Sequence, residues 1–304
     1  MPEPRARRSE LATPASSEKM CMKAATSGAD LVFLDLEDAC APVAKEAART
    51  TAVRALTEQD WGRTVSAVRI NGIDTPWCYG DIIEVVTGAR EALDVLIVPK
   101  ARTARDVWWV DVLLTQLETK LRLGKRIALE VLIEESEGLA NAVEIARSSP
   151  RLEAIIFGAG DLSASQRARV DGNFDPISEY PGDFWHFARA QVVTAARVAG
   201  IDAIDAPYPA YQDPDGYRRS ATHASLLGFD GKWAIHPSQI EIANEVFAPT
   251  AEEVAEAREA IEIYRRSEAD GVGAIGRDGR LVDAAHMRLA ENTLYKASLA
   301  DGRR

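Results

Sequence analysis

Short apolar runs alternate along the chain with longer segments whose apolar residues recur at helical spacing. The runs stay apolar on both faces, which is typical of parallel strands covered by helices. Eight such runs occur, at 9–14, 30–36, 64–70, 93–99, 126–133, 153–159, 201–207 and 232–237. Eight strand–helix repeats predict an α/β fold of the (β/α)8 TIM-barrel type. An open doubly wound sheet is disfavoured, because no GxGxxG motif follows the first run.

Three helical segments illustrate the pattern between the runs, at 103–123, 137–147 and 184–199. The loop at 166–183 is rich in turn residues, so we predict an exposed excursion after the sixth strand.

The pattern changes near residue 247, where we predict that the barrel domain (1–247) ends. Segment 248–304 opens with a Pro-Thr cap signal and continues as a charged amphipathic helix. A glycine-rich, hairpin-like stretch and a last helix around 284–299 follow. Because this tail is too polar for barrel core, we predict a lid or an oligomerisation arm.

Three of the apolar runs end in acidic residues: LVFLDLED (31–38), IALEVLIEE (127–135) and IIFGAGD (155–161). A carboxylate at the end of a buried strand is costly unless something binds it. In a TIM barrel, the carboxyl ends of the strands form the active face. This rule places the following residues around one rim: Asp35, Glu37, Asp38, Arg69, Lys100, Glu134, Asp161, Asp205 and His236.

Glu134 and Asp161 follow adjacent predicted strands, so their side chains are candidates to share one metal ion. Ligation by few carboxylates, with water and substrate completing the shell, is typical of Mg²⁺, and Mn²⁺ is an alternative. Zinc would require His or Cys ligands nearby. The fork of Arg69 matches a carboxylate or a developing oxyanion. It also suits a salt bridge to Asp35 or Glu37, and both roles can coexist.

Other roles remain open for several of these residues. Glu37, Asp38 and Lys100 are equally compatible with structural ion pairs at the barrel mouth. The GAGD turn permits close approach of a ligand at Gly160, or simply forms a tight connection. His236 fits a packed residue that caps the last strand as well as a catalytic one.

Composition narrows the class of protein. The net charge of −11 disfavours nucleic acid or an anionic membrane as a general partner. Three widely spaced cysteines without a CxxC pair argue against a disulfide framework and against a zinc site. The basic N-terminus lacks the apolar stretch of a secretory signal, and no run is long enough to span a bilayer. We therefore expect a cytoplasmic enzyme.

Several motifs together resemble the citrate lyase β-subunit-like branch of the HpcH/HpaI aldolase superfamily, and within it the malyl-CoA/β-methylmalyl-CoA lyases. In chain order, the matching stretches are RSELATP, KAATSGADLVFLDLEDACAPVAKEAAR, VRINGIDT, VPK, LEVLIEESEGLANAVEIA, FGAGD and GFDGKWAIHPSQIEIANEVFAPT. The resemblance extends over nearly the whole chain.

This resemblance implies a Mg²⁺-dependent lyase that acts on CoA thioesters and forms trimers or hexamers. By motif, Glu134 and Asp161 match metal ligands, and Arg69 matches the arginine that binds the oxo acid. Asp283 matches a lid aspartate that relatives insert into a neighbouring subunit as acid/base. The predicted catalytic set is thus Arg69, Asp283, Glu37 and Asp35. The predicted substrate and CoA contacts are Lys23, Arg69, Gly160, Ile235 and His236.

Three departures from the family pattern concern specificity. Asp205-Ala206-Pro207 stands where relatives often read DGP, Ser17 replaces an arginine, and the 166–183 loop is shorter than in some malyl-CoA lyases. We expect cleavage of a 3-hydroxyacyl-CoA such as malyl-CoA to glyoxylate and acetyl- or propionyl-CoA. The alternatives are a citramalyl-CoA lyase, a malyl-CoA thioesterase, and a citrate lyase β subunit that works only in a larger complex.

Overall fold

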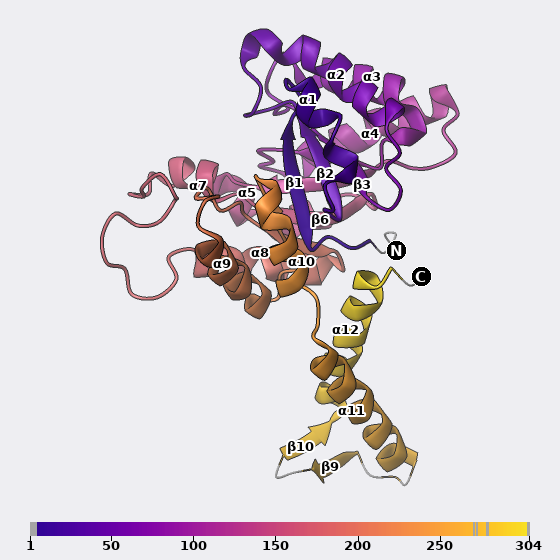
Figure 1. Ribbon diagram of the computed structural model, residues 1–304, viewed down its shortest axis with the longest axis vertical. Coiled ribbons are helices and arrows are strands. Elements are labelled where there is room, and N and C mark those ends of the chain that lie inside the picture. The colour runs from indigo at the N-terminus through magenta and orange to yellow at the C-terminus, as the bar shows by residue number, and fades with distance from the viewer. Residues whose placement is uncertain (1–4, 270, 272, 278–279, 303–304) are drawn as a thin grey trace. The chain divides into compact units, whose positions relative to one another are not determined.

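The computed structural model describes residues 5–269, 271, 273–277 and 280–302. Within these residues the chain divides into two compact units, one over Arg7–Glu245 and one that includes the described residues from Val246 onward. The first unit is a closed barrel of eight parallel strands in sequence order, which confirms the predicted fold (Figure 1). Its strands are β1 (Ser9–Pro14), β2 (Leu31–Asp35), β3 (Val65–Arg69), β4 (Val95–Val98), β5 (Ala128–Ile133), β6 (Leu152–Phe157), β7 (Asp202–Asp205) and β8 (Gly231–Ala234).

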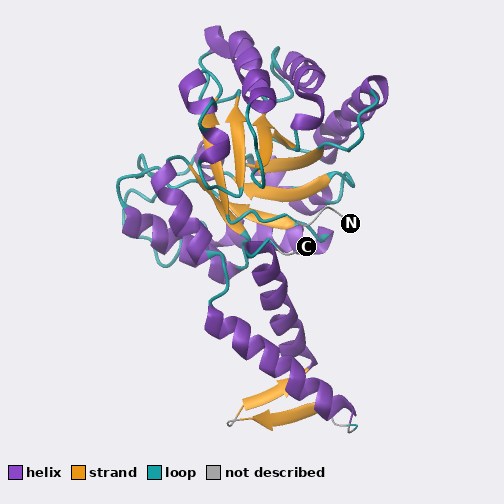
Figure 2. Cartoon of the chain, turned by 45° about the vertical axis from the view of Figure 1, so that its right-hand side comes forward, coloured by secondary structure: helices purple, strands orange, loops and turns teal. Residues whose placement is uncertain are grey.

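Helices connect successive strands and cover the outside of the barrel (Figure 2). They are α1 (Glu18–Cys21), α2 (Lys45–Glu58), α3 (Cys78–Ala89), α4 (Ala104–Leu121), α5 (Ser136–Ala140), α6 (Ala142–Ala146), α7 (Ala159–Ser165), α8 (His186–Ala199), α9 (Pro214–Leu227) and α10 (Ile240–Val246), with short 3₁₀ turns at Ala24–Thr26, Pro42–Ala44, Arg90–Ala92 and Pro237–Gln239. The helix predicted over 137–147 is interrupted at Asn141, where the backbone leaves the helical region. None of the described helices combines the length and the apolar composition that crossing a bilayer would require.

The barrel interior is apolar in its middle and charged at both ends. Alternate strand residues such as Phe33, Ile97 and Trp233 form the central cluster. At the amino ends of the strands, Arg7 bonds to three carboxylates: Nε to Glu130 Oε1 at 2.8 Å, Nη1 to Asp202 Oδ2 at 3.1 Å, and Nη2 to Glu153. Glu10 is fully buried nearby and accepts a 2.9 Å hydrogen bond from Trp233 Nε1.

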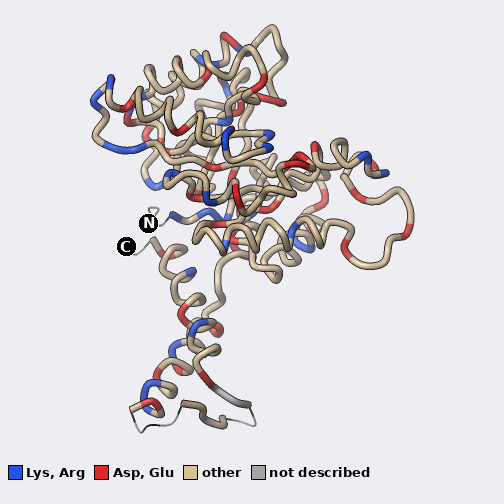
Figure 3. Tube along the Cα trace, turned by 180° about the vertical axis from the view of Figure 1, so that it is seen from behind, with Lys and Arg blue, Asp and Glu red and all other residues tan. Residues whose placement is uncertain are grey.

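The second unit contains a helix pair, α11 (Ala251–Ala269) and α12 (Ala284–Ala300), and the two-stranded antiparallel ribbon β9 (Ala274–Arg277) and β10 (Arg280–Asp283). Thr250 caps α11 as its sequence predicted, because its hydroxyl accepts the Glu253 N–H and the Glu253 carboxylate accepts the Thr250 N–H. Ala257, Ile261 and Ala290 form its small apolar core. Acidic and basic positions are interspersed along both helices (Figure 3). The roles of this unit as lid and oligomerisation arm, and the domain boundary at 247, stay predictions.

Candidate active site

The candidate site is built on alternate residues that face into the barrel. Side chains along a strand point to opposite faces in turn, so residues two apart share a face. Glu134 follows Ala128 and Leu132 on the inner face at the end of β5, and Arg69 follows Val65 and Ala67 in β3. Asp35 continues the inner row of β2. Inward-facing charges therefore meet at the carboxyl end of the barrel.

Arg69 holds the centre of this charged cluster. Its Nε and Nη2 donate to the two carboxylate oxygens of Asp35 at 2.8 and 2.6 Å, and its Nη1 lies 2.9 Å from Glu37 Oε2. The guanidinium also lies 5.3 Å from the centroid of the Trp233 ring. Burial disfavours its charge, but Asp35 and Glu37 more than compensate, so the pKa of Arg69 is raised. The arginine is thus a fixed cation.

The pKa values of Asp35 and Glu37 are shifted in opposite directions. Burial opposes ionisation of Asp35, but the Arg69 guanidinium outweighs it and lowers the pKa of Asp35 below its usual value. The Asp35 carboxylate also accepts the N–H groups of Glu37 and Ala39 at 2.9 and 3.1 Å. Burial raises the pKa of Glu37 to about 7, although Arg69 and Lys100 favour its ionised form. Asp35 therefore serves as a permanent anion, while Glu37 is poised to exchange a proton near neutral pH.

Glu134 and Asp161 come from the ends of β5 and β6. Burial raises the pKa of Glu134 to about 8, and the neighbouring Glu37 and Asp161 carboxylates add to this rise. Asp161 lies in the first turn of α7 and is partly exposed. Lys100 contacts both residues: its backbone N–H donates to Glu134 Oε1 at 2.9 Å, and its Nζ lies 3.4 Å from Asp161 Oδ2. The two predicted ligands are thus brought into one cluster.

The donor set fits a hard cation. A Cβ at Gly158 would lie 2.8 Å from Glu134 Oε2 and 2.5 Å from Glu134 Cβ, so the glycine leaves room for this carboxylate. No group of three or more His, Cys, Asp and Glu side chains arranged for metal binding occurs among the described residues. Two carboxylates, with water and substrate as further ligands, suit Mg²⁺ and do not suit the closed cage of a structural zinc site.

Asp205 and His236, both expected at this rim, have other partners in the structure. The Asp205 side chain is fully buried and faces outward, because Ile204 takes the inner position; it pairs with Lys232 Nζ at 2.5 Å and with Arg189 Nε of α8 at 2.9 Å. The expectation that Asp205 belongs to the rim cluster was therefore wrong. His236 is exposed, stacks on Tyr211 with ring centroids 5.0 Å apart, and accepts the Ser238 N–H through Nδ1. His236 thus caps the 3₁₀ turn Pro237–Gln239, and its contact with substrate or CoA stays a prediction.

The remaining predicted contacts are distributed around the same unit or lie in the second one. Ile235 follows β8 and is 37% exposed, and Lys23 is exposed before the turn Ala24–Thr26. Asp283 caps α12 in the second unit: its Oδ1 accepts the N–H of Ala285 at 2.9 Å and bonds with His286 Nδ1 at 2.8 Å. These hydrogen bonds, from the His286 side chain first, lower the pKa of Asp283.

Phe174, in the 166–183 loop, contacts the GAGD turn, and the sequence did not predict this contact. Within this predicted excursion, Val170 and Pro176 form a β-bridge, and Phe174 has a left-handed backbone (φ 64°). A Cβ at Gly160 would lie 3.0 Å from the Phe174 ring, so this ring packs on the GAGD turn. Trp185 Nε1 donates to the Phe174 carbonyl at 2.9 Å and fixes the hairpin. The Asn-Phe-Asp tip gave no sequence signal for this contact.

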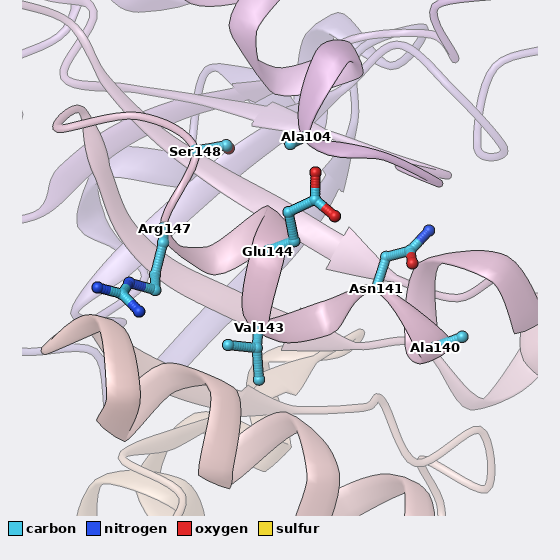
Figure 4. A pocket seen from close by; sticks show the side chains of 7 residues that line it. All are labelled: Ala104, Ala140, Asn141, Val143, Glu144, Arg147 and Ser148. Atoms are coloured by element: carbon cyan, nitrogen blue, oxygen red, sulfur yellow. The ribbon is translucent and has the colours of Figure 1, made fainter.

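Among the described residues, hollows on the barrel unit include the following two. One of about 550 Å³ is lined by Ala159 and Phe174 together with Arg189, Tyr208 and His223, and by none of the charged cluster residues. Another, of about 570 Å³, lies between the start of α4 and the α5–α6 junction. There the Glu144 carboxylate and the Arg147 guanidinium point to different sides (Figure 4). None of the predicted site residues lines this second hollow, so it offers no convergent chemistry.

A barrel with an acid–arginine cluster at its carboxyl end is the arrangement expected of a TIM-barrel enzyme. Residues 8–237 match the model of the HpcH/HpaI aldolase/citrate lyase family. The chain belongs to this family and is a lyase. It is 41% identical to the L-malyl-CoA/β-methylmalyl-CoA lyase of Rhodobacter capsulatus, over 97% of this chain and 96% of that protein.

One further relative is named for a different reaction, and one similar protein has a solved structure. The (3S)-malyl-CoA thioesterase of Cereibacter sphaeroides is 36% identical, over 95% of this chain and 94% of that protein. The crystal structure of the protein CitE from Mycobacterium tuberculosis, in complex with magnesium, acetoacetate and coenzyme A, superimposes with a TM-score of 0.75. It is 29% identical and the match covers 97% of this chain and 98% of that one. The resemblance drawn from the motifs is thereby confirmed.

Proposed function

We propose that this protein is a Mg²⁺-dependent lyase that cleaves, or forms, a 3-hydroxyacyl-CoA such as malyl-CoA or β-methylmalyl-CoA. The products of cleavage are glyoxylate and acetyl-CoA or propionyl-CoA. One observation carries the proposal: Glu134 and Asp161 share Lys100 as a neighbour, while Arg69, held by Asp35, lies in the same cluster. The similarity to malyl-CoA/β-methylmalyl-CoA lyase supports the choice of substrate.

Glu134 and Asp161 would hold the magnesium ion. When bound, the ion supplies Lewis-acid stabilisation of negative charge on the substrate oxygen. Arg69 places a fixed guanidinium in the same cluster, where it binds the oxo-acid part and stabilises the oxygen that becomes a carbonyl. Its bond to Asp35 keeps the guanidinium oriented before substrate arrives.

The reaction needs one base and returns one proton. Asp283, from a neighbouring subunit, removes the proton of the 3-hydroxyl group of the substrate. The carbon–carbon bond between the hydroxyl-bearing carbon and the carbon next to the thioester then breaks. Its electron pair passes to the thioester as an enolate, and the protonated Asp283 returns the proton to carbon. In the synthetic direction the same carboxylate takes the α-proton of the acyl-CoA.

The remaining assignments belong to the same proposal. Lys23, Gly160, Ile235 and His236 contact the substrate or CoA, and Glu37 supports Arg69. The chain forms a homo-oligomer, a trimer or a hexamer, in which the second unit acts as lid. The three cysteines are free and buried, which supports a reducing, cytoplasmic location.

A condensation assay tests the reaction. The enzyme is mixed with acetyl-CoA or propionyl-CoA and with glyoxylate or pyruvate, with and without Mg²⁺, and the adduct is identified by mass. We expect a glyoxylate adduct only with Mg²⁺. A pyruvate adduct in its place would identify a citramalyl-CoA lyase, and no adduct with any pair would contradict the proposal.

A thioesterase is the second candidate, because a malyl-CoA thioesterase is among the relatives. Incubation with malyl-CoA and Mg²⁺ separates the two reactions. Glyoxylate supports the lyase, whereas free malate without glyoxylate identifies the thioesterase. Unchanged activity after truncation at residue 270 would instead favour the subunit of a larger complex, or a different base.

A further inference from the structure

Lys100 is the residue that contacts both members of the proposed metal pair. It follows β4, on the strand that lies between β3 with Arg69 and β5 with Glu134. Its backbone reaches Glu134, and its ammonium reaches Glu37 Oε1 at 2.5 Å and both Asp38 Oδ1 and Asp161 Oδ2 at 3.4 Å. The proposed mechanism assigns it no task.

The backbone of Lys100 adopts an unfavourable conformation. Its φ of 52° lies in the left-handed region, which side chains other than glycine, asparagine and aspartate rarely occupy. This conformation aims the N–H at Glu134 Oε1 with a 2.9 Å hydrogen bond. Backbone strain of this kind persists where the surrounding structure imposes it, and it concentrates at functional sites. The main chain of Lys100 thus orients the buried ligand.

The backbone of Lys100 favours metal binding, whereas its charged side chain opposes it. Four carboxylates gather here, those of Glu37, Asp38, Glu134 and Asp161, and Lys100 provides a positive charge to three of them directly. A divalent ion bound to Glu134 and Asp161 would meet this ammonium at close range. Two cations that share the same anions compete for them, and they repel each other.

We infer that Lys100 is a positioning residue with two functions: its backbone presets Glu134 for the metal, and its ammonium balances the acidic cluster until the metal displaces it from Asp161. This inference rests on the proposed metal site. It predicts that the Lys100 ammonium weakens metal binding while it stabilises the metal-free enzyme. A lysine with a purely structural role would instead favour both metal binding and the stability of the metal-free enzyme.

Two variants separate the charge from the backbone. Lys100→Met removes the ammonium and keeps a Cβ, and Lys100→Gly removes the ammonium and fits the left-handed backbone without strain. Arg102→Met is the matched control, because Arg102 is a nearby cation whose contacts are Asp74 and Glu135, at 3.6 and 3.8 Å. Glu134→Gln tests whether Mg²⁺ binds at the proposed site.

Magnesium binding is measured by calorimetric titration of the full chain with MgCl₂ at about pH 9, where carboxylates are ionised. We expect both Lys100 variants to lower the Kd for Mg²⁺ by at least about tenfold, and Arg102→Met to leave it unchanged. In thermal melts we expect a lower Tm for both Lys100 variants without Mg²⁺, and a larger rise of Tm when Mg²⁺ is added.

The outcomes distinguish a failure of this inference from a failure of the proposed metal site. If Glu134→Gln binds Mg²⁺ as the wild type does, the proposed metal site is wrong and the role of Lys100 falls with it. If Glu134→Gln abolishes binding but Lys100→Met and Lys100→Gly bind more weakly or unchanged, only the inference is overturned. Tighter binding by Lys100→Gly alone would also overturn it, because the effect would then come from the backbone.

Discussion

Asp35 and Arg69 are paired twice: they are register partners on neighbouring parallel strands, and two hydrogen bonds join their side chains. The backbone register therefore fixes the position of a cation at the barrel mouth. Glu37 joins this pair, because its carboxylate contacts Nη1 of the same guanidinium. Arginine alone among side chains provides such a planar set of donors.

Arg69→Lys tests the importance of this geometry. We expect kcat/KM to fall about 10²- to 10³-fold, because a point charge cannot bond both oxygens of Asp35 and also face the substrate. The charge is retained, so the loss reports orientation. Steady-state kinetics measure it, with Arg54→Lys as the control, because Arg54 forms exposed ion pairs on α2. Wild-type kcat/KM in Arg69→Lys would contradict the assignment of Arg69.

Gly158→Ala tests the space reserved for Glu134. The new Cβ would lie 2.5 Å from Glu134 Cβ, so this side chain must move. We expect Mg²⁺ affinity to fall about 10- to 100-fold, as for other changes that disturb a metal ligand. Gly172→Ala is the control, because nothing lies within 4 Å of the Cβ it would add. Equal affinities in the two variants would show that Glu134 has no such constraint.

Glu10→Gln tests the acid buried inside the barrel. Burial, and then the neighbouring Glu130, raise the pKa of Glu10 well above its usual value, and its Oε1 has no hydrogen-bond partner. A raised pKa means that the folded state keeps a proton that the unfolded state releases. The contribution of Glu10 to the unfolding free energy of the wild type therefore falls as pH rises above about 4.3, by up to about 1.4 kcal/mol per pH unit.

Glutamine does not titrate, so we expect Glu10→Gln to gain stability relative to the wild type as pH rises. Urea unfolding at a series of pH values measures the difference between the two proteins. Glu46→Gln, at an exposed position of α2, controls for the change in net charge. Parallel curves for Glu10→Gln and wild type would show that the buried acid is ionised in the folded state.

Asp283 is tested by two substitutions with different effects on α12. Asparagine keeps an oxygen that caps the helix, whereas alanine removes the cap at a cost of about 1 kcal/mol. We expect both variants to bind Mg²⁺ and to lose nearly all turnover. Near-wild-type turnover in either would remove Asp283 from the mechanism.

Mixing experiments address the subunit that supplies Asp283. We expect inactive Asp283→Ala and inactive Glu134→Gln chains to regain activity when they are unfolded and refolded together, since some sites then receive both intact residues. Failure to regain activity in verified mixed oligomers would place Asp283 and its barrel in the same subunit.

The strands could be predicted from the sequence, and so could the end of the barrel at which the candidate residues lie. The spacing of apolar residues and the order of the elements along the chain determine both. A salt bridge of Arg69 to Asp35 or Glu37 was one of the roles left open, and the structure shows both. The buried charges inside the barrel were harder to predict from the sequence, because Glu10 and Glu130 lie in runs that are apolar overall. The prediction for Asp205 was wrong because successive residues of a strand point to opposite faces. An error of one residue in the position of the strand end therefore moves a side chain from the inner face to the outer one.

The contacts of Lys100 and Phe174 could not be predicted either. Each depends on a left-handed backbone at a residue type that rarely adopts it, so neither has a local sequence signal. Their partners, Glu134 and Gly160, lie on other loops. Tertiary packing imposes both conformations.

The cluster around Arg7 has a practical consequence for anyone who shortens this chain. Arg7 precedes the first strand, in a stretch that looks like a dispensable leader, yet it is the common counter-charge of carboxylates on β5, β6 and β7. A fragment trimmed to begin at β1 would remove the counter-charge that these three acids share. The boundary for producing a working barrel therefore lies before Arg7.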